Sequence, residues 1–324
     1  MKLKSIFITI AIVISVCGMI SGCDKITGSN EEETSAVSVT LMTDAGNGVE
    51  SELNETARLG LEDAEAELGI EGRNIKCSDT EDMKSNIDIL VKAGKTDLII
   101  GAGERFEEVI SVEAAKYPKQ KFAVIDADKT SKPHENVVYI SFDDERAGFM
   151  AGFIAGKMTS KNKIACIGSD TNEYISGFEK GAKTANDKIE EILTRNADPM
   201  SDPEASKNAA NDVTYYGADV IFAPLPDDSK SVIDRVDNST KIIAVNTDQY
   251  TYSKEKVIAS IIKSYKKAVY NVSVMAYNEE DFKGGQNIFY SAKDGGIALS
   301  SSTENTVPPD VIMRLDKALK EEYK

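Results

Sequence analysis

The sequence of 324 residues has no tryptophan, one histidine and four cysteines. Because His134 is the single histidine, the chain has almost no means of building a zinc site or a histidine-based catalytic site. Cys17 and Cys23 lie near the start of the chain. No disulfide or metal-binding spacing joins Cys77 and Cys166, so we interpret both as buried thiols. We therefore expect no metal and no cofactor.

Positive charge is also in short supply. The chain has 38 lysines and arginines against 54 aspartates and glutamates, which gives a net charge of −16. Such a chain is a poor partner for nucleic-acid backbones and for anionic lipid, so neither is expected to bind it, and the charge favours solubility. The hydrophobic fraction of 41% is enough for one large domain or two medium domains with a core.

The first 36 residues have the pattern of an export signal and a tether. Lys2 and Lys4 precede a short apolar run that ends in Ile20-Ser21-Gly22-Cys23. This pattern is typical of a secretory signal and is too short for a permanent span. Its end resembles the bacterial lipobox, which implies a signal peptide over 1–22 and a lipid on Cys23; a plain signal peptide with a chance cysteine is the alternative. Residues 23–36 are polar and acidic, which predicts a flexible tether.

From Val37 onward, short apolar runs alternate with segments of helical periodicity such as Glu52–Leu68. The alternation forms two successive series of similar length. The expected strands are Val37–Met42, Asn74–Ser78, Asp97–Ile100, Lys121–Ile125 and Asn136–Phe142, then Lys163–Gly168, Ile189–Thr194, Asp219–Ala223, Lys241–Val245 and Val257–Ile262. Two such series predict an α/β protein of two doubly wound parallel-sheet lobes.

No Pro- or Ser-rich linker separates the two series, so we expect short crossings that act as a hinge. The first lobe is predicted over 37–142 plus about 264–285, and the second over 143–263 plus about 286–324. This arrangement is that of a type I periplasmic-binding-protein-like fold, in which a ligand lies in the cleft between the lobes.

Polar residues and glycines follow the predicted strands. The carboxyl ends of parallel strands form the ligand-binding edge of an open α/β sheet, and glycines there let the backbone approach a ligand. An acidic edge with one lysine suits a neutral polyol, sugar or nucleoside better than a phosphate, and the sequence has no P-loop or complete dinucleotide motif. Each aspartate taken alone is also a common helix cap or loop residue. The residues concerned are Asp44, Gly101, Gly103, Asp126, Asp128, Asp170, Asn246, Asp248 and Lys263.

Seven segments in order resemble motifs of the basic membrane protein family, the lipoprotein subunits of ABC importers that bind substrates such as purine nucleosides. The resemblance runs over nearly the whole mature length. The segments are Thr43–Gly46 with Leu53-Asn54, Asp97–Gly103 with Tyr117-Pro118 and Phe122–Asp126, Phe149–Gly152, Gly177–Gly181, Gly217–Phe222, Asn246–Gln249 and Ala259–Tyr270.

The resemblance implies a nucleoside base held between two phenylalanine rings. Phe178 matches one ring, with plain helix core as the alternative, whereas the other ring falls on Leu53, a departure from the family. Aromatic stacking of this kind contributes about 0.5–1.5 kcal/mol beyond burial. Leu225–Asp228 replaces a glycine-rich loop, and Glu52 stands where the family has serine. These departures bear on which ligand is bound.

Polar ligand contacts are implied by the same resemblance. Asp248 and Lys263 match the residues that hold the ribose, although Lys263 could instead neutralise the acidic edge. Asp44, Asn54 and Asp126 match the other polar contacts.

The sequence therefore predicts a monomeric, lipid-anchored binding protein on the outer face of the bacterial cytoplasmic membrane. It would capture a nucleoside, most simply a purine nucleoside, and deliver it to an ABC permease by closing its lobes. Three alternatives stay open: a sugar or other small-molecule ligand in the same fold, an enzyme such as a nucleoside hydrolase, and an adhesin or signalling partner. The absence of tryptophan argues against a sugar, and the scattered aspartates argue against a calcium-dependent hydrolase.

Overall fold

The computed structural model describes residues 36–44, 52–168, 172–198, 202, 204–225, 229–278 and 281–323. The predicted signal peptide, Cys23, Asp170 and all of the predicted tether except Ala36 lie outside the described residues. No helix within those ranges is long and apolar enough to cross a bilayer.

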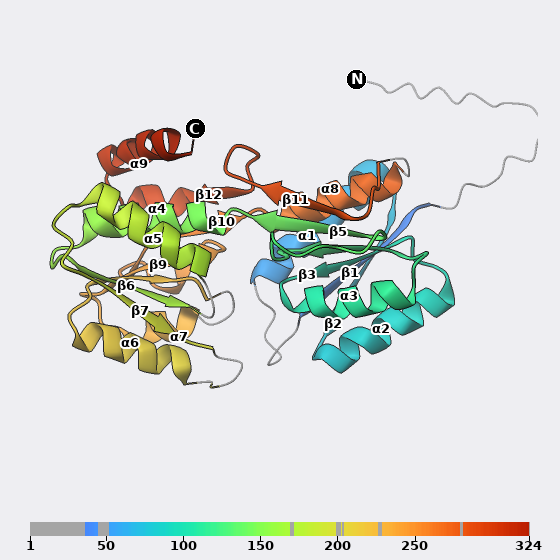
Figure 1. Cartoon of the computed structure of the whole chain (residues 1–324), viewed down its shortest axis with the longest axis horizontal. Helices are drawn as coiled ribbons and strands as arrows, with labels where there is room; N and C mark the ends of the chain where they lie inside the picture. The colour runs from blue at the N-terminus through green and yellow to red at the C-terminus, as the bar shows by residue number, and fades with distance from the viewer. Residues whose placement is uncertain are drawn as a thin grey trace, which may run out of the picture. The chain divides into compact units, whose positions relative to one another are not determined.

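Two six-stranded sheets organise the described chain (Figure 1). The first has the order β11-β5-β4-β3-β1-β2, and all of its strands are parallel. Its strands are β1 (Ser38–Asp44), β2 (Glu71–Cys77), β3 (Leu98–Ala102), β4 (Lys121–Ile125), β5 (Val137–Phe142) and β11 (Gln286–Tyr290).

The second sheet has the order β12-β10-β9-β8-β6-β7, and only the short β12 runs antiparallel to its neighbour. Its strands are β6 (Lys163–Gly168), β7 (Glu191–Asn196), β8 (Val220–Ala223), β9 (Lys241–Asn246), β10 (Val257–Lys263) and β12 (Ile297–Leu299). The predicted fold class, two doubly wound parallel-sheet lobes, is confirmed.

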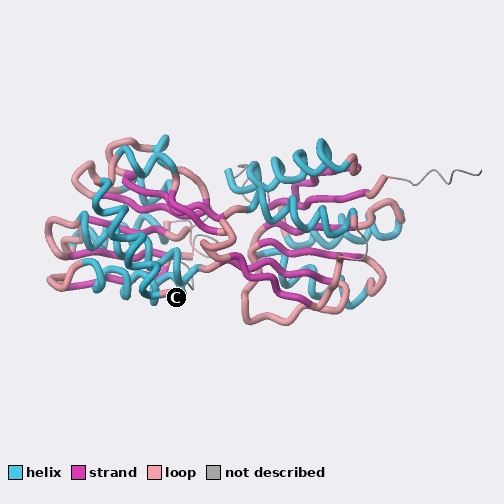
Figure 2. Tube along the Cα trace, turned by 90° about the horizontal axis from the view of Figure 1, so that it is seen from above, coloured by secondary structure: helices cyan, strands magenta, loops and turns pink. Residues whose placement is uncertain are grey.

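Helices cover both faces of each sheet, and Figure 2 shows the helices of the upper face lying over the strands. Because both faces are covered, alternate strand residues face different cores: Leu41 packs in one apolar cluster and Met42 in another. The helices are α1 (Glu52–Leu68), α2 (Thr80–Ala93), α3 (Arg105–Lys116) and α8 (Tyr265–Tyr277) on the first sheet, and α4 (Asp144–Met158), α5 (Asn172–Ala185), α6 (Ala205–Tyr215), α7 (Ser229–Arg235) and α9 (Pro309–Glu322) on the second, with short 3₁₀ turns at Tyr250–Tyr252 and Ser301–Asn305.

Helices α4 and α5 pack backbone against backbone. A Cβ atom on Gly148 would overlap the carbonyl oxygen of Tyr174, and one on Gly152 would overlap that of Phe178. The glycine-rich composition of the predicted helix 143–158 therefore serves close helix packing, as expected. Cys77 and Cys166 are buried free thiols, also as expected.

The chain crosses between the sheets three times. The first crossing joins β5 to α4, the second joins β10 to α8, and the third follows β11. The third lies later than expected. The sequence predicts that the second lobe resumes at about residue 286, but Gln286–Tyr290 pairs in parallel with Val138–Phe142 of β5. A five-residue strand carries no sequence signal of the sheet that it joins. Its place is decided by the unpaired edge of β5, which it completes.

Candidate functional site

The strand register brings the predicted site residues of each lobe to one edge of its sheet. In the first sheet, Thr43 is level with Ala102 and Ala102 with Ile125. Asp44 at the end of β1, Gly103 after β3 and Asp126 after β4 therefore lie at the same edge. In the second sheet, Asn246 is level with Ile262, which directly precedes Lys263. The prediction that these residues end neighbouring parallel strands agrees with this register.

The two predicted glycines have different surroundings. A Cβ on Gly101 would overlap the side chains of Phe106 and Ile110, so Gly101 is required for packing α3 onto β3. Gly103 has a left-handed φ of 114° and open space where a Cβ would stand. Its N–H donates to the carbonyl of Ile125 at 2.9 Å. Gly103 thus turns the chain from β3 into α3 and leaves room beside itself.

Asp44 and Asn54 lie together at the end of β1. The buried amide of Asn54 donates to the backbone carbonyl of Asp44 at 2.5 Å. The carboxylate of Asp44 forms an ion pair with Arg105, the first residue of α3. Arg105 is not among the predicted site residues, because residues 61 positions apart meet only through the pairing of β1 with β3.

A buried charged cluster surrounds Lys263, whose side chain is only 2% exposed. Its ammonium donates to Oδ1 and Oδ2 of Asp126 at 2.8 and 2.9 Å. It also lies 2.9 Å from Oδ1 of Asp144, the first residue of α4. The hydroxyl of Tyr265 donates to Oδ2 of Asp126 at 2.6 Å, and the ring of Tyr174 lies beside the ammonium of Lys263. We call these five residues the Lys263 cluster.

Electrostatics within the Lys263 cluster are set by two carboxylates and one cation. Burial alone would lower the pKa of Lys263, but Asp126 and Asp144 outweigh it and hold that pKa well above its usual value. Burial, together with repulsion by Asp126, raises the pKa of Asp144 even though Lys263 opposes the shift. The charged form of Lys263 is favoured and that of Asp144 is disfavoured, because one ammonium cannot fully compensate two carboxylates. The cluster therefore carries net negative charge.

Glu104, immediately before α3, responds to the same charges. Protein surrounding its carboxyl raises the pKa of Glu104 from 4.5 to about 7, repulsion by Asp126 and Asp144 adds to the rise, and Lys263 opposes it. Glu104 is an exposed residue, so solvent screens its carboxyl as well. An acidic site with a carboxyl that titrates near neutrality favours ligands that donate hydrogen bonds and disfavours anions.

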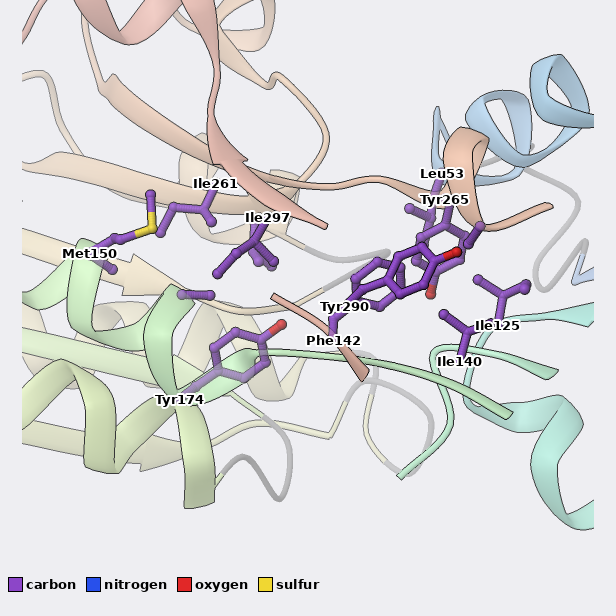
Figure 3. Close-up of a cluster of buried hydrophobic side chains, with 14 of the residues drawn as sticks. Leu53, Ile125, Ile140, Phe142, Met150, Tyr174, Ile261, Tyr265, Tyr290 and Ile297 are labelled. Carbon is purple, nitrogen blue, oxygen red and sulfur yellow. The ribbon is translucent and has the colours of Figure 1, made fainter. Parts of the chain in front are cut away.

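Aromatic rings lie beside the Lys263 cluster. Figure 3 shows Phe142, Tyr265 and Tyr290 grouped together, with Tyr174 apart from them. Phe142 stacks on Tyr265 with ring centroids 5.5 Å apart, and Tyr290 meets the edge of Phe142 at 5.9 Å. The ammonium of Lys263 lies 5.5 Å from the Phe142 ring centre and 5.4 Å from that of Tyr174. These rings exclude water and strengthen the charged contacts that they surround.

Asp248 lies further along the edge of the second sheet. Its carboxylate accepts hydrogen bonds from the hydroxyl of Ser302 at 2.6 Å and from the backbone N–H of Tyr250 at 3.2 Å. These contacts tie the loop after β9 to the turn after β12. Among the described residues no hydrogen bond or ion pair joins Asp248 to Lys263, and their shared role at a ribose stays a prediction.

Asn246 ends β9 with an unusual combination of burial and missing partners. It is 2% exposed and adopts a left-handed φ of 75°. Neither its amide nitrogen nor its amide oxygen has a hydrogen-bond partner, and no other described residue leaves two buried side-chain atoms unpaired in this way. Thr43, at the edge of the first sheet, leaves its buried hydroxyl unpaired. Unsatisfied buried polar groups are rare and costly, so each requires an explanation.

Phe178 and Leu53, the positions matched to the two rings around the base, both belong to apolar cores. Phe178 is fully buried in α5 and stacks on Phe222 at 5.6 Å. Leu53 is 8% exposed and packs in the cluster of α1. Within the described residues, no group of three metal-ligating side chains is present.

Comparison with known proteins identifies the family. The model of the family described as ABC transporter substrate-binding protein PnrA-like matches residues 37–323. The chain is 27% identical to a CD4+ T-cell-stimulating antigen of Listeria innocua over 99% of its own length and 93% of that protein. It is 24% identical to the ABC transporter nucleoside-binding protein BmpA of Lactococcus lactis over 96% of its own length and 95% of that protein.

A solved structure supports the same fold. The solute-binding protein of an ABC transporter system from Aeropyrum pernix superposes with a TM-score of 0.69 at 23% identity, covering 88% of this chain and 86% of the other. The predicted resemblance to the basic membrane protein family is confirmed by the family match. That family consists of solute-binding proteins rather than enzymes. The chain thus belongs to the PnrA-like family of ABC transporter substrate-binding proteins.

Proposed function

We propose that this substrate-binding protein captures a nucleoside at the facing edges of its two sheets. Asn246 carries the proposal. A buried amide without partners can accept up to two hydrogen bonds and donate two, so it fits a ligand that presents a donor beside an acceptor. Nucleosides present such pairs on the base edge and on the ribose. The name of the Lactococcus lactis relative supports the same ligand class.

The negative charge of the Lys263 cluster supports a neutral ligand over a nucleotide. Asp126 belongs to this cluster and Glu104 interacts with it, and a phosphate would add charge of the same sign. Asp44, Asn54, Gly103 and Asp248 line the remaining strand ends, and we propose them as further contacts. Phe178 is not retained as a base contact, because its ring is occupied by Phe222.

We further propose that the chain is anchored by a lipid on Cys23 at the outer face of the cytoplasmic membrane and passes its ligand to an ABC permease. The Ile20–Cys23 lipobox supports the anchor. Replacement of Cys23 by serine should release the protein into the soluble fraction of intact cells, as measured by immunoblotting. A protein that still sediments with the membrane would contradict the lipid anchor.

The ligand is tested by calorimetry on the full chain in a mild detergent, against nucleosides, nucleotides and sugars. We expect heat from adenosine, inosine or guanosine and none from the corresponding monophosphates. Asn246→Gly keeps the left-handed backbone and removes the amide. It should weaken nucleoside binding by about tenfold or more, which corresponds to a lost buried hydrogen bond of roughly 1.5 kcal/mol.

A matched control is Asn162→Gly, at a second asparagine with a left-handed φ, of 55°. Its amide oxygen already accepts from Asn186 at 3.1 Å, so its replacement should leave ligand affinity unchanged. Equal affinities for the Asn246 variant and the parent would remove Asn246 from the site. Heat of binding from sugars alone would show that the ligand is a sugar and not a nucleoside.

A further inference from the structure

The turn after β12 carries a serine that reaches the carboxylate of Asp248. Ser302 lies in the 3₁₀ turn Ser301–Asn305, and its hydroxyl donates to Oδ1 of Asp248 at 2.6 Å, across 54 positions of sequence. A second bond to Oδ1 comes from the backbone N–H of Tyr250, at 3.2 Å. That bond joins residues two positions apart and is the ordinary turn contact of an aspartate in a loop. Of the two bonds, only the one from Ser302 ties this carboxylate to another element.

Both bonds use the same oxygen of the carboxylate. Oδ1 of Asp248 accepts from Ser302 and from Tyr250, whereas Oδ2 has no hydrogen bond or ion pair with any described residue. Asp248 is half-buried, and Oδ2 is not among the buried polar atoms that lack a partner, so this oxygen reaches solvent. An ionised carboxylate accepts hydrogen bonds on both oxygens. The side chain is thus held through Oδ1, and Oδ2 is left for a donor of the ligand.

The backbone beside Asp248 is held separately, by the residue that follows it. Gln249 is 2% exposed, and its side-chain oxygen accepts from the hydroxyl of Ser229, the first residue of α7, at 2.5 Å. The backbone N–H of Gln249 donates to the hydroxyl of Ser260 on β10 at 3.1 Å. With the backbone fixed in this way, the freedom that Asp248 retains is the rotation of its side chain. Ser302 contacts that side chain and restricts this rotation.

Ser302 is supported by a short chain of hydroxyls. Its oxygen lies 3.0 Å from the hydroxyl of Ser300, which lies 3.0 Å from that of Thr303. The backbone N–H of Ser300 donates to the carbonyl of Ser260 at 2.8 Å, so the turn is joined to β10. Because an ionised carboxylate only accepts, Ser302 donates its single proton to Asp248 and receives one from Ser300. The direction of the bond to Asp248 is therefore determined.

We propose that Ser302 is a positioning residue that acts on the ligand through Asp248. The bond to Oδ1 orients the carboxylate before the ligand arrives, so that binding does not have to order it. This inference rests on the proposed function, in which Asp248 is a ligand contact. If Ser302 only joined the turn to the lobe, removal of its hydroxyl would leave the affinity unchanged.

The first measurement needs no ligand and follows amide hydrogen exchange of the full chain in a mild detergent at pH 7. Ser302→Ala should speed exchange at the backbone N–H of Tyr250 about fivefold or more, because the acceptor of that N–H is no longer held. Ser302→Thr keeps the hydroxyl and should exchange like the parent. The matched control is Ser239→Ala, before the opposite end of β9, where a hydroxyl likewise donates to a carboxylate, that of Asp237, at 2.5 Å. It should leave exchange at Tyr250 unchanged.

The second measurement is calorimetry with adenosine on the same proteins. Ser302→Ala should weaken binding about three- to tenfold, whereas Ser302→Thr and Ser239→Ala should bind within about twofold of the parent. Faster exchange at unchanged affinity would indicate a structural role alone. Weaker binding at unchanged exchange would indicate that Ser302 contacts the ligand itself, and an equal loss in Ser302→Thr would assign the effect to side-chain shape. Each of these three results would overturn the proposal.

The two proposals fail in different ways. If the parent gives heat with a sugar and with no nucleoside, the proposed function fails, and the positioning role is measured with that sugar on the same variants. If Ser302→Ala leaves exchange at Tyr250 as it is in the parent, the positioning role fails whichever ligand binds. In a parent that binds no compound of the panel, the exchange rates alone decide whether Ser302 holds Asp248.

Discussion

Removing the ammonium of Lys263 should be among the most destabilising single changes in this chain. In Lys263→Met the side-chain volume is nearly kept, so little packing is lost, but Asp126 and Asp144 remain without their cation. Breaking a buried ion pair from one side costs about 3–5 kcal/mol. The side chains of Lys263 and Asp126 are 2% and 7% exposed, so solvent screens them little, whereas Asp144 is 22% exposed and can rehydrate. We therefore expect a loss near the lower limit, about 3 kcal/mol.

This loss is measured by urea denaturation at pH 7, or as a fall in melting temperature of roughly 6 °C for a unit of this size. The control is Lys230→Met, which breaks an ion pair with Asp234 whose side chains are 61% and 60% exposed. Exposed pairs of this kind contribute about 0.3–0.5 kcal/mol. If Lys263→Met cost no more than Lys230→Met, the assignment of Lys263 as the necessary cation of a buried cluster would be refuted.

Three further predictions concern the pH response and the core. The pKa of Glu104 is raised to about 7, so the contribution of Glu104 to stability is full below about pH 4.5 and is lost as the pH rises through 7. Glu104→Gln should therefore make the melting temperature depend less on pH between pH 5 and pH 8. A pH dependence equal to that of the parent would contradict the shift. Phe178→Ala should lower the free energy of unfolding by about 3–5 kcal/mol in urea denaturation, since its ring packs on Phe222. It should change the affinities for purine and pyrimidine nucleosides to the same extent. A loss of purine affinity alone, at unchanged stability, would indicate that Phe178 contacts the ligand. Gly152→Ala should destabilise the fold by about 1–3 kcal/mol, because a Cβ would overlap the carbonyl of Phe178. Gly156→Ala should destabilise it less, because the atom nearest to that Cβ is 3.0 Å away. A larger loss of unfolding free energy for Gly156→Ala than for Gly152→Ala in urea denaturation would be inconsistent with this packing.

The sequence by itself determined the architecture. Apolar runs bounded by turns predict buried parallel strands, and their alternation with helical periodicity predicts two α/β lobes, because these patterns depend only on local spacing. The strand Lys121–Ile125, the strand Lys163–Gly168 and the helix Glu52–Leu68 have the bounds that the sequence predicts. The polar residues at strand ends were also predictable, since the carboxyl ends of parallel strands meet at one edge.

Only the tertiary structure decided which of those polar residues meet. The contacts of Lys263 with Asp126 and Asp144 join residues more than a hundred positions apart, and no local pattern encodes which carboxylates share one ammonium. The same holds for the pairing of Asp44 with Arg105 and for the place of β11 beside β5. Phe178 is a further example. A sequence motif placed it correctly on a helix, but the motif did not indicate that its ring packs against Phe222. Spacing along a chain fixes elements, whereas contacts between elements depend on how their faces pack, and the candidate site is built almost entirely from such contacts.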